Sequence, residues 1–479
     1  MFIDGKKYDS STTSCTDQIR VLNPATGELV GTACLATSED VDFALDSCHA
    51  AFKQWSEKSF LQRSAVLSQI SSWLKEKPLR EDLAILLTKE QGKPLREARR
   101  EIEGVTEVID YFVGLASMTH TDFFTSKSNG SYSFTVKKPL GVCASILPWN
   151  MPALVLAWKA VPALLTGNAC FVKPSGICPL TVLELAAIFH EAGLPAGVLN
   201  VVTGSGSAIG NQLAQSPFVK KISFTGSSEA GKKLHIAAAQ NNKRVTLELG
   251  GSDAMIICDD ADIQECAKQA VHARFFNCGQ TCVSPKRIFV FESVFDDFVK
   301  AVLEAVSQLK IGNGLSEDTT TGPLSSFEEQ KKMIEYVESV RKEKASSVLI
   351  GGNVPPNSDP KGSFFEPAVL IQVPMTSRVM TEEVFGPIMV INSVKDMDEA
   401  LKYSNETQFG LGASVWTNDL RQAKKAIEGF DVGIVWVNQH MKMLPELPFG
   451  GVKESGFGRE NGYQMLNEYM ETKTVVFIF

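Results

Sequence analysis

Residues 198–231 read VLNVVTGSGSAIGNQLAQSPFVKKISFTGSSEAG, and this stretch decides the fold. Short apolar runs end in glycine-containing turns, and apolar residues at helical spacing follow each turn. The pattern predicts strands at 198–203 and 221–224, and helices at 208–215 and up to residue 240. It continues to both sides, with strands expected at 139–147, 168–173 and 245–247 and helices at 153–165 and 179–192. Strands that alternate with helices are typical of a parallel sheet with crossover helices.

The rest of the chain adds a helical segment and a second α/β segment. Helices are predicted at 38–55, 61–75, 81–91 and 97–115, and we interpret this first quarter as scaffold because it carries no chemical motif. Strand and helix patterns alternate again between 390 and 437. A chain of 479 residues exceeds the size of one hydrophobic core, so two or more domains are expected.

Composition and charge exclude several classes of protein. With 44% hydrophobic and 21% charged residues, the chain has the composition of a soluble globular protein. A net charge of -8 argues against a nucleic-acid partner, which needs a basic face, and against an anionic membrane surface. No apolar run is long enough to span a membrane.

The termini and the cysteines predict a cytoplasmic protein. The N-terminal residues MFIDGKK lack the features of a secretory signal. The ten cysteines are scattered without a CxxC pair, which predicts reduced thiols. The six histidines are also dispersed, and no metal site is expected.

Residues 277–285 read NCGQTCVSP, and Cys282 in this stretch is a candidate nucleophile. A thiol is nucleophilic near neutral pH and forms thiohemiacetals and thioesters that are readily made and broken. Taken alone, one cysteine among ten is more typical of a small buried apolar residue.

Two strand ends carry side chains that suit such chemistry. Asn150 follows the predicted strand 139–147, where α/β sheets place ligands, and it is a candidate hydrogen-bond donor or a turn asparagine. Glu248 lies between leucines and before two glycines, which favours burial over an exposed edge position. Burial would raise its pKa and suit it to act as a general base.

Other strand ends have features of an anion site. Gly204 and Gly226 begin glycine-containing turns before helices, where backbone N–H groups favour a phosphate. The spacing of Gly204, Gly206 and Gly210 is GxGxxxG, which is weak evidence for a dinucleotide by itself. Lys173 and Ser175 add a cation and a hydroxyl at another strand end.

Seven short motifs in this order resemble those of the NAD(P)-dependent aldehyde dehydrogenase superfamily, over nearly the whole chain: PWN (148–150), KPS (173–175), FTGS (224–227), ELGG (248–251), GQTC (279–282), EVFGP (383–387) and PFGG (448–451). The resemblance implies an α/β fold with a doubly wound parallel-sheet cofactor domain, an α/β catalytic domain and a small β oligomerisation arm. The expected boundaries are 1–121 with 141–248 for the first, 249–457 for the second, and 122–140 with 458–479 for the arm.

The resemblance also implies the reaction and its residues. Cys282 would attack the aldehyde, Asn150 and the Cys282 N–H would stabilise the oxyanion, and Glu248 would activate the water that hydrolyses the thioester. NAD or NADP would bind at these positions: Pro148, Trp149, Lys173, Ser175, Gly204, Phe224, Gly226, Ser227, Leu249, Gly250, Glu383 and Phe385. Many NAD-preferring relatives have Glu where this chain has Gly176, so the sequence leaves the choice of cofactor open.

Residues at the family's aldehyde tunnel are apolar: Met151, Trp158, Phe276, Met443 and Phe449. They favour an uncharged aliphatic or aromatic aldehyde. The alternative is an ω-carboxylate aldehyde of the succinate-semialdehyde type, whose carboxylate Arg274, Lys442 or His440 would have to hold. A cysteine hydrolase and a non-catalytic relative are remote alternatives, since the former leaves the cofactor motifs unexplained and the latter would be expected to lack Cys282, Glu248 or Asn150.

The C-terminal residues TVVFIF (474–479) predict a strand that pairs with a partner subunit, because such an exposed strand would promote aggregation. A homodimer or homotetramer is therefore expected. Whether Cys278 pairs oxidatively with Cys282 is left open.

Overall fold

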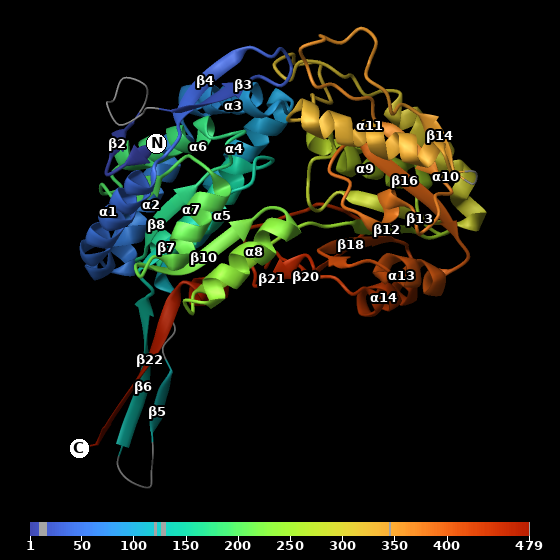
Figure 1. Ribbon diagram of the computed structural model, residues 1–479. Coiled ribbons are helices and arrows are strands. Elements are labelled where there is room, and N and C mark those ends of the chain that lie inside the picture. Colours follow the sequence, from blue (N-terminus) through green and yellow to red (C-terminus); the bar gives the residue numbers. More distant parts are fainter. Residues whose placement is uncertain (9–16, 119–121, 126–130, 344–345, 479) are drawn as a thin grey trace.

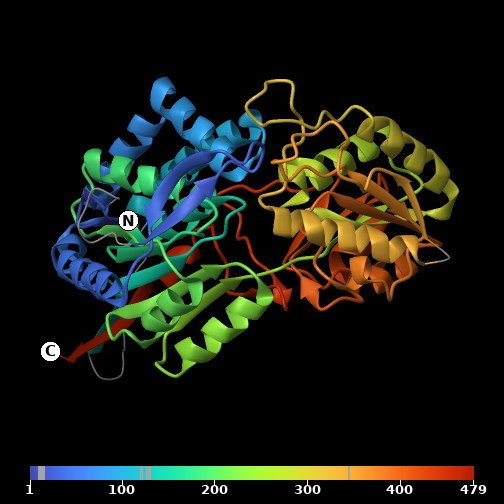
Figure 2. The same cartoon turned by 45° about the horizontal axis from the view of Figure 1, so that its top comes forward.

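The computed structural model describes residues 1–8, 17–118, 122–125, 131–343 and 346–478. Two α/β bodies lie side by side, and a long β arm extends from the first of them (Figures 1 and 2). The predicted fold class is confirmed, whereas the exact domain boundaries stay a prediction.

The first body contains an eight-stranded sheet in the order β2-β1-β9-β8-β7-β10-β11-β21. Its five inner strands from β9 to β11 are parallel, as the alternating pattern predicts. The strands are β1 (Phe2–Ile3), β2 (Lys6–Lys7), β7 (Val142–Ile146), β8 (Ala169–Lys173), β9 (Leu199–Val201), β10 (Val219–Thr225), β11 (Arg244–Glu248) and β21 (Gly456–Phe457). The chain runs from β7 to β8 on one side and later to β10 on the other, so the carboxyl ends of β7 and β10 form a topological switch point.

Helices cover both faces of this sheet. Alternate strand residues such as Cys143 and Val172 pack in one apolar cluster with residues of α2, α4, α5 and α6, and their neighbours Ala144 and Phe171 pack in another with α1 and α7. The helices of this body are α1 (Ser38–Glu57), α2 (Phe60–Leu74), α3 (Lys77–Gln91), α4 (Leu95–Gly114), α5 (Pro152–Leu165), α6 (Leu180–Glu191), α7 (Gly206–Gln215) and α8 (Ser228–Ala239). Side chains of Thr37, Ser59, Ser205 and Ser227 cap α1, α2, α7 and α8, which fixes where these helices begin. The hairpin β3 (Gln18–Leu22) and β4 (Leu29–Cys34) forms a separate two-stranded sheet.

The second body contains a seven-stranded sheet in the order β14-β15-β16-β13-β12-β18-β19. All pairs are parallel except β14 with β15. The strands are β12 (Asp253–Ile257), β13 (Pro285–Phe291), β14 (Ser347–Ile350), β15 (Ala368–Ile371), β16 (Ile388–Val394), β18 (Gly412–Trp416) and β19 (Ile434–Val437). The main helices are α9 (Ile263–Phe275), α10 (Phe295–Val306), α11 (Phe327–Arg341), α13 (Met397–Asn405) and α14 (Leu420–Gly429), with the short α12 (Arg378–Thr381) beside the cavity described below. The pair β17 (Phe409–Gly410) and β20 (Val452–Lys453) leads back towards the first body.

The arm is a three-stranded sheet in the order β22-β6-β5, formed by β5 (Phe123–Thr125), β6 (Ser131–Pro139) and β22 (Met470–Ile478). The C-terminal strand β22 pairs antiparallel with β6 of the same chain along its whole length. One edge of β22 is therefore paired within the chain, and pairing of its other edge with a partner subunit stays a prediction. Phe123, Phe124 and Val476 are exposed on the arm.

Eight cysteines in the described part of the chain are free. Among the described helices, none combines the length and the apolar composition of a membrane span. The described residues also contain no group of three or more His, Cys, Asp and Glu side chains that could hold a metal ion.

Candidate active site

A cavity of about 1060 Å³ lies between the two bodies. The ends of β7, β8, β10 and β11 line it from the first body, and residues 281–283, α11 and α12 line it from the second. It includes every residue that the sequence predicts for the site except Gly204 and the three candidate carboxylate-binding residues Arg274, His440 and Lys442. The sequence motifs therefore converge on one place, although they are up to several hundred residues apart.

Asn150 lies at the floor of this cavity and is 7% exposed. Its side-chain Nδ2 donates a hydrogen bond to the carbonyl oxygen of Gln280 at 3.0 Å. An amide nitrogen carries two hydrogens, so one N–H is held by this contact and the other remains available to a ligand. The predicted turn position and the predicted donor role are both compatible with this geometry.

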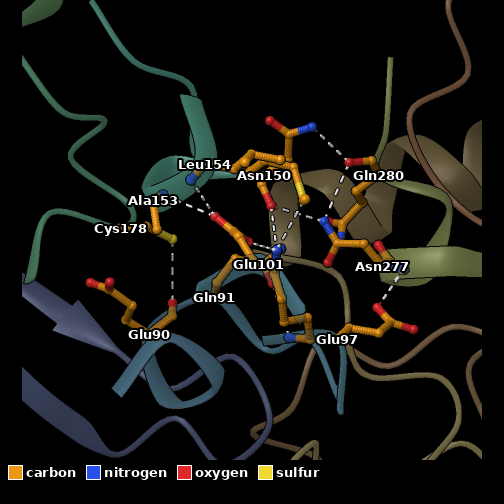
Figure 3. A network of polar contacts seen from close by, with 12 residues as sticks. Glu90, Gln91, Glu97, Glu101, Asn150, Ala153, Leu154, Cys178, Asn277 and Gln280 are labelled. Atoms are coloured by element: carbon orange, nitrogen blue, oxygen red, sulfur yellow. Dashed lines mark hydrogen bonds and ion pairs between the residues drawn. The ribbon is translucent and has the colours of Figure 1, made fainter. Parts of the chain in front are cut away.

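Behind Asn150 lies a buried polar network from α4 and the loop before it (Figure 3). The ammonium of Lys93 pairs with Glu101 and donates to the carbonyl oxygen of Asn150 at 2.7 Å. The other carboxylate oxygen of Glu101 accepts from the N–H groups of Ala153 and Leu154, at 2.9 and 3.3 Å, in the first turn of α5. Lys93 and Glu101 thus fix the backbone at the Asn150 carbonyl and at the start of α5 directly after it.

The same network reaches the second body through Glu97 and Asn277. Glu97 accepts from the backbone N–H of Asn277 at 2.8 Å, and the Asn277 side chain donates to the Asn150 carbonyl at 3.1 Å. Burial raises the pKa of Glu97 to about 7. The interpretation of residues 97–115 as mere scaffold missed these contacts. A signal was available, because Glu101 lies between apolar residues on the buried face of an amphipathic helix.

Residues 277–284, here termed the Cys282 loop, have an unusual backbone. Asn277, Cys278 and Gly279 have positive φ angles of 50°, 55° and 72°. A Cβ on Gly279 would lie 2.4 Å from the carbonyl oxygen of Gly386, so only glycine fits there. Cys278 packs in the apolar core of the second body and does not line the cavity, whereas Cys282 does. Nothing in this arrangement favours oxidative pairing of the two thiols.

Arg274 lies outside the cavity, which corrects its prediction as a substrate-binding residue. It is fully buried, and its guanidinium donates to the carbonyl oxygens of Ile388, Gly279, Val384 and Gly386 and to the Ser284 hydroxyl. The N–H groups of its guanidinium thus bind groups of the protein and do not face a substrate. The other two candidates also fail, because His440 is buried behind the Cys282 loop and Lys442 does not line the cavity.

Glu248 is 3% exposed and lines the cavity, and neither carboxylate oxygen has a hydrogen-bond partner among the described residues. Burial, followed by repulsion from Glu460, raises its pKa well above the ordinary range. A buried carboxyl without partners is costly to the fold and is typical of a functional group. The space beside it requires Gly450, where a Cβ would lie 2.7 Å from Glu248 Oε1.

Cys282 is half-buried, and burial raises the pKa of its thiol to about 12, with the Lys286 ammonium acting in the opposite direction. The thiol form therefore dominates at neutral pH in the ligand-free protein. Any reaction through the thiolate requires a charge or a donor that stabilises it.

The larger part of the cavity has the features of a dinucleotide site. Lys173 is 7% exposed, burial lowers the pKa of its ammonium, and no hydrogen bond to its Nζ occurs within the described residues. The N-termini of α7 and α8 face the same space through Gly206, Ser207, Gly226 and Ser227. A Cβ on Gly226 would lie 2.7 Å from the Phe224 ring, so the turn requires glycine.

Glu383 and an aromatic pair form the other wall of this part. Glu383 accepts from the N–H of Gly251 at 2.9 Å, and the rings of Trp149 and Phe385 meet edge to face at 5.4 Å. The N-termini of α7 and α8 and the Lys173 ammonium suit the phosphates of a nucleotide. The rings of Trp149 and Phe385 suit its planar base. Sequence reasoning missed several lining residues of this part, which carry no motif of their own: Ser207, Glu229, Lys233, Lys332, Tyr336 and Arg378.

Gly204 does not line the cavity, which corrects its prediction as a cofactor residue. A Cβ there would meet Ile209 at 2.9 Å and Ala36 at 3.4 Å, so the position is closely packed. The helix α7 begins two residues later, and Gly206 lines the cavity instead.

The remaining part of the cavity is apolar. Trp158 and Phe449 pack with ring centroids 4.9 Å apart, and Met151, Phe276 and Met443 line the same cavity. Their role in binding the aldehyde stays a prediction. Leu154, Val155 and Met441 also line the cavity, and the sequence did not single them out. Within the described residues, the cations that line the cavity are Lys173, Lys233, Lys332 and Arg378, which come from the segments of the dinucleotide part.

Fold and cavity together define an α/β protein of two bodies with a dinucleotide-like cavity that a cysteine lines. The chain belongs to the aldehyde dehydrogenase family, whose family model matches residues 11–475. It is an NAD(P)-dependent oxidoreductase that acts on small-molecule aldehydes, and the resemblance seen in the sequence is confirmed.

Particular relatives support this assignment. The chain is 38% identical over 472 residues to glutarate-semialdehyde dehydrogenase of Pseudomonas putida, covering 98% of this chain and 96% of that one. A crystal structure of an E. coli NADP-dependent enzyme matches with a TM-score of 0.95 and 35% identity, over 100% of this chain and 98% of that one. Betaine aldehyde dehydrogenase from Staphylococcus aureus in complex with NAD+ matches with a TM-score of 0.94 and 34% identity, over 99% and 94% of the two chains. The expected cofactor class, NAD or NADP, is confirmed.

Proposed function

We propose that the protein oxidises an aldehyde to the carboxylic acid through a covalent intermediate on Cys282. The observation that carries this proposal is that Cys282, Asn150 and Glu248 line one cavity beside the dinucleotide part. In the first step the Cys282 thiol loses its proton to water, the thiolate sulfur attacks the aldehyde carbon, and the carbonyl oxygen becomes the oxyanion of a thiohemiacetal.

The free N–H of Asn150 and the backbone N–H of Cys282 are the proposed donors to this oxyanion. Each such donor is worth about 3 kcal/mol in comparable sites. A bound NAD or NADP supplies the hydride acceptor for the oxidation, which leaves a thioester on Cys282. Glu248, as a carboxylate, then takes a proton from a water molecule that attacks the thioester and releases the acid.

The proposed substrate is an uncharged aliphatic or aromatic aldehyde, because the walls around Trp158, Phe276 and Phe449 are apolar. A second candidate is an ω-carboxylate aldehyde, which the name of the Pseudomonas putida relative favours. A carboxylate in the apolar part would need a cation, and Arg274 is not available to it.

A substrate panel tests the two candidates. With purified protein, we expect kcat/KM for uncharged aliphatic or aromatic aldehydes to exceed that for succinate and glutarate semialdehydes by at least about tenfold. Production of reduced nicotinamide is the measurement. A preference for the semialdehydes would favour the second candidate, and no activity with either group would contradict both.

The choice of cofactor depends on position 176, where the chain has open space. A Cβ on Gly176 would meet only Ile19, at 3.9 Å. We propose that NADP is accommodated here, and we expect Gly176→Glu to lower kcat/KM for NADP by about tenfold or more, because a carboxylate repels the 2′-phosphate. The neutral Gly176→Gln variant is the control for size. Equal losses in both variants would show that bulk, and not charge, determines the effect.

We also propose that the protein forms a homodimer or homotetramer through its arm. The exposed Phe123, Phe124 and Val476 and the open edge of β22 support this proposal. Light scattering should give a mass of two or four chains, and the mass of a single chain at micromolar concentration would exclude it. The cytoplasmic location stays a prediction.

A further inference from the structure

The Cys282 loop is held by side chains along its whole turn. Five consecutive carbonyl oxygens, from Gly279 to Val283, each accept a hydrogen bond from a side chain that is buried. The donors are Arg274 to residue 279 at 3.2 Å, Asn150 to 280 at 3.0 Å, Lys286 to 281 at 3.1 Å and to 282 at 2.9 Å, and His440 to 283 at 2.8 Å. Because these carbonyls are fixed, the loop presents Cys282 to the cavity in one orientation.

His440 forms its hydrogen bond to the loop as a neutral side chain. A carbonyl oxygen can only accept, so His440 Nε2 donates to Val283, and Nδ1 accepts from the Ser414 hydroxyl at 2.7 Å. Burial lowers the pKa of His440 to about 3, which keeps the ring neutral. A neutral side chain is therefore sufficient to fix a carbonyl of this loop.

Lys286 differs from His440 because it brings a charge. It is 1% exposed and lies at the start of β13, directly behind the loop. Burying an ammonium costs far more than burying a neutral donor, unless opposite charges lie nearby. Burial lowers the pKa of Lys286, and the Arg274 guanidinium acts in the same direction, whereas Glu383 and Asp253 favour the charged form.

The ionisable groups whose charges act on the Cys282 thiol are Lys286, Asp253, Glu383 and Glu248. Burial raises the pKa of the three carboxyl groups, that of Asp253 to about 8. Asp253 accepts from the N–H of Gly412 at 3.0 Å, lies 4.0 Å from His440 Nε2 and has one oxygen without a partner. When they are ionised, the three carboxyl groups disfavour the thiolate form of Cys282. Of these groups, only the Lys286 ammonium favours the thiolate, and its Nζ donates a hydrogen bond to the carbonyl oxygen of Cys282.

We propose that Lys286 is a positioning residue that holds Cys282 by its own carbonyl oxygen and, as a fixed buried cation, stabilises the thiolate of that side chain. The inference rests on the proposed role of Cys282 as the nucleophile. It assigns to one lysine two effects that experiments can separate, the geometry of the loop and the charge beside the sulfur.

The test is the rate of alkylation of Cys282 by iodoacetamide, followed by mass spectrometry of the peptide that contains it. Because burial raises the pKa of this thiol to about 12, the range from about pH 6 to about pH 10 covers the rising limb of the profile, and a displacement of this limb along the pH axis gives the movement of the midpoint. Lys286→Gln keeps a donor but removes the charge, and it should move the midpoint of the profile to higher pH. Below the midpoint, a rise of one pKa unit lowers the rate constant about tenfold at a given pH. Lys286→Arg retains the charge and should leave the midpoint close to that of the unmodified protein.

His440→Gln is the matched control, because it loosens the same loop without removing a charge. It should lower kcat and leave the alkylation midpoint in place. The inference is overturned if Lys286→Gln keeps the original midpoint, or if His440→Gln moves it as far. If circular dichroism shows that Lys286→Gln does not fold, the Lys286→Arg variant provides the test. A midpoint at higher pH in Lys286→Arg would contradict the proposed role of the charge.

Alkylation needs neither aldehyde nor cofactor, so its result is independent of turnover. If the protein shows no aldehyde oxidation but Lys286→Gln still moves the alkylation profile, the role of Lys286 stands and the proposed reaction of Cys282 is wrong. An unchanged alkylation profile with normal dehydrogenase turnover would reject only the role of Lys286.

Discussion

Replacing Cys282 by alanine is expected to lower kcat for aldehyde oxidation by at least about 10⁴-fold, because the variant cannot form the covalent intermediate. Cys282 is the only cysteine that lines the cavity in the described part of the chain. The loop carbonyls are held by other residues, so the fold and the dinucleotide part should survive the substitution. Steady-state production of reduced nicotinamide gives the activity, and titration of reduced cofactor by fluorescence shows whether binding persists.

Cys278→Ala is the control for this experiment. The residue lies four positions earlier in the same loop, but it is buried in the apolar core of the second body. We expect this variant to retain most of its turnover and to lose some thermal stability, since a small cavity remains. Robust steady-state turnover by the Cys282→Ala protein would defeat the assignment of the nucleophile.

Glu248→Gln is expected to stop the reaction after one turnover, with a steady-state rate about 10² to 10⁴-fold lower. The glutamine fits the same space but cannot accept a proton from water, so the thioester persists. Rapid mixing should therefore show a burst close to one reduced nicotinamide per active site. A slow hydride step without a burst would place Glu248 earlier in the reaction.

Hydroxylamine provides a control, because it attacks thioesters without a general base. It should restore turnover to the Glu248→Gln protein and have no such effect on Cys282→Ala. The pH dependence follows from the raised pKa of Glu248. The base is the carboxylate, and its fraction grows as pH rises towards the raised pKa. Thioester hydrolysis should accelerate with pH in the unmodified protein, and this rise should be absent from the glutamine variant.

Local sequence patterns were sufficient for most of the fold. The alternation between residues 139 and 248 predicted the inner strands β7, β8, β9, β10 and β11 and the helices between them, because strand and helix periods are properties of short segments. Positions at strand ends, such as Asn150 and Glu248, could be proposed because parallel strands bring their carboxyl ends to one edge. The short motifs then joined Cys282 to the same site.

Long-range side-chain contacts could not be predicted in this way. Glu97 meets the backbone of Asn277 across 180 residues of sequence, and no local pattern specifies that pairing. Arg274 was misassigned for a related reason. Its closeness in sequence to the predicted tunnel suggested substrate binding, but its side chain turns into the protein to hold the Cys282 loop. Which way a long side chain points depends on the packing of distant segments.

Peptide mass spectrometry of the Glu248→Gln protein, quenched in acid after mixing with cofactor and an aromatic aldehyde, tests covalent catalysis most directly. We expect the peptide that contains Cys282 to gain the mass of the aldehyde less two hydrogens, as for a thioester. An unmodified peptide at a time when reduced nicotinamide has formed, or an acyl group on another residue, would contradict covalent catalysis by Cys282.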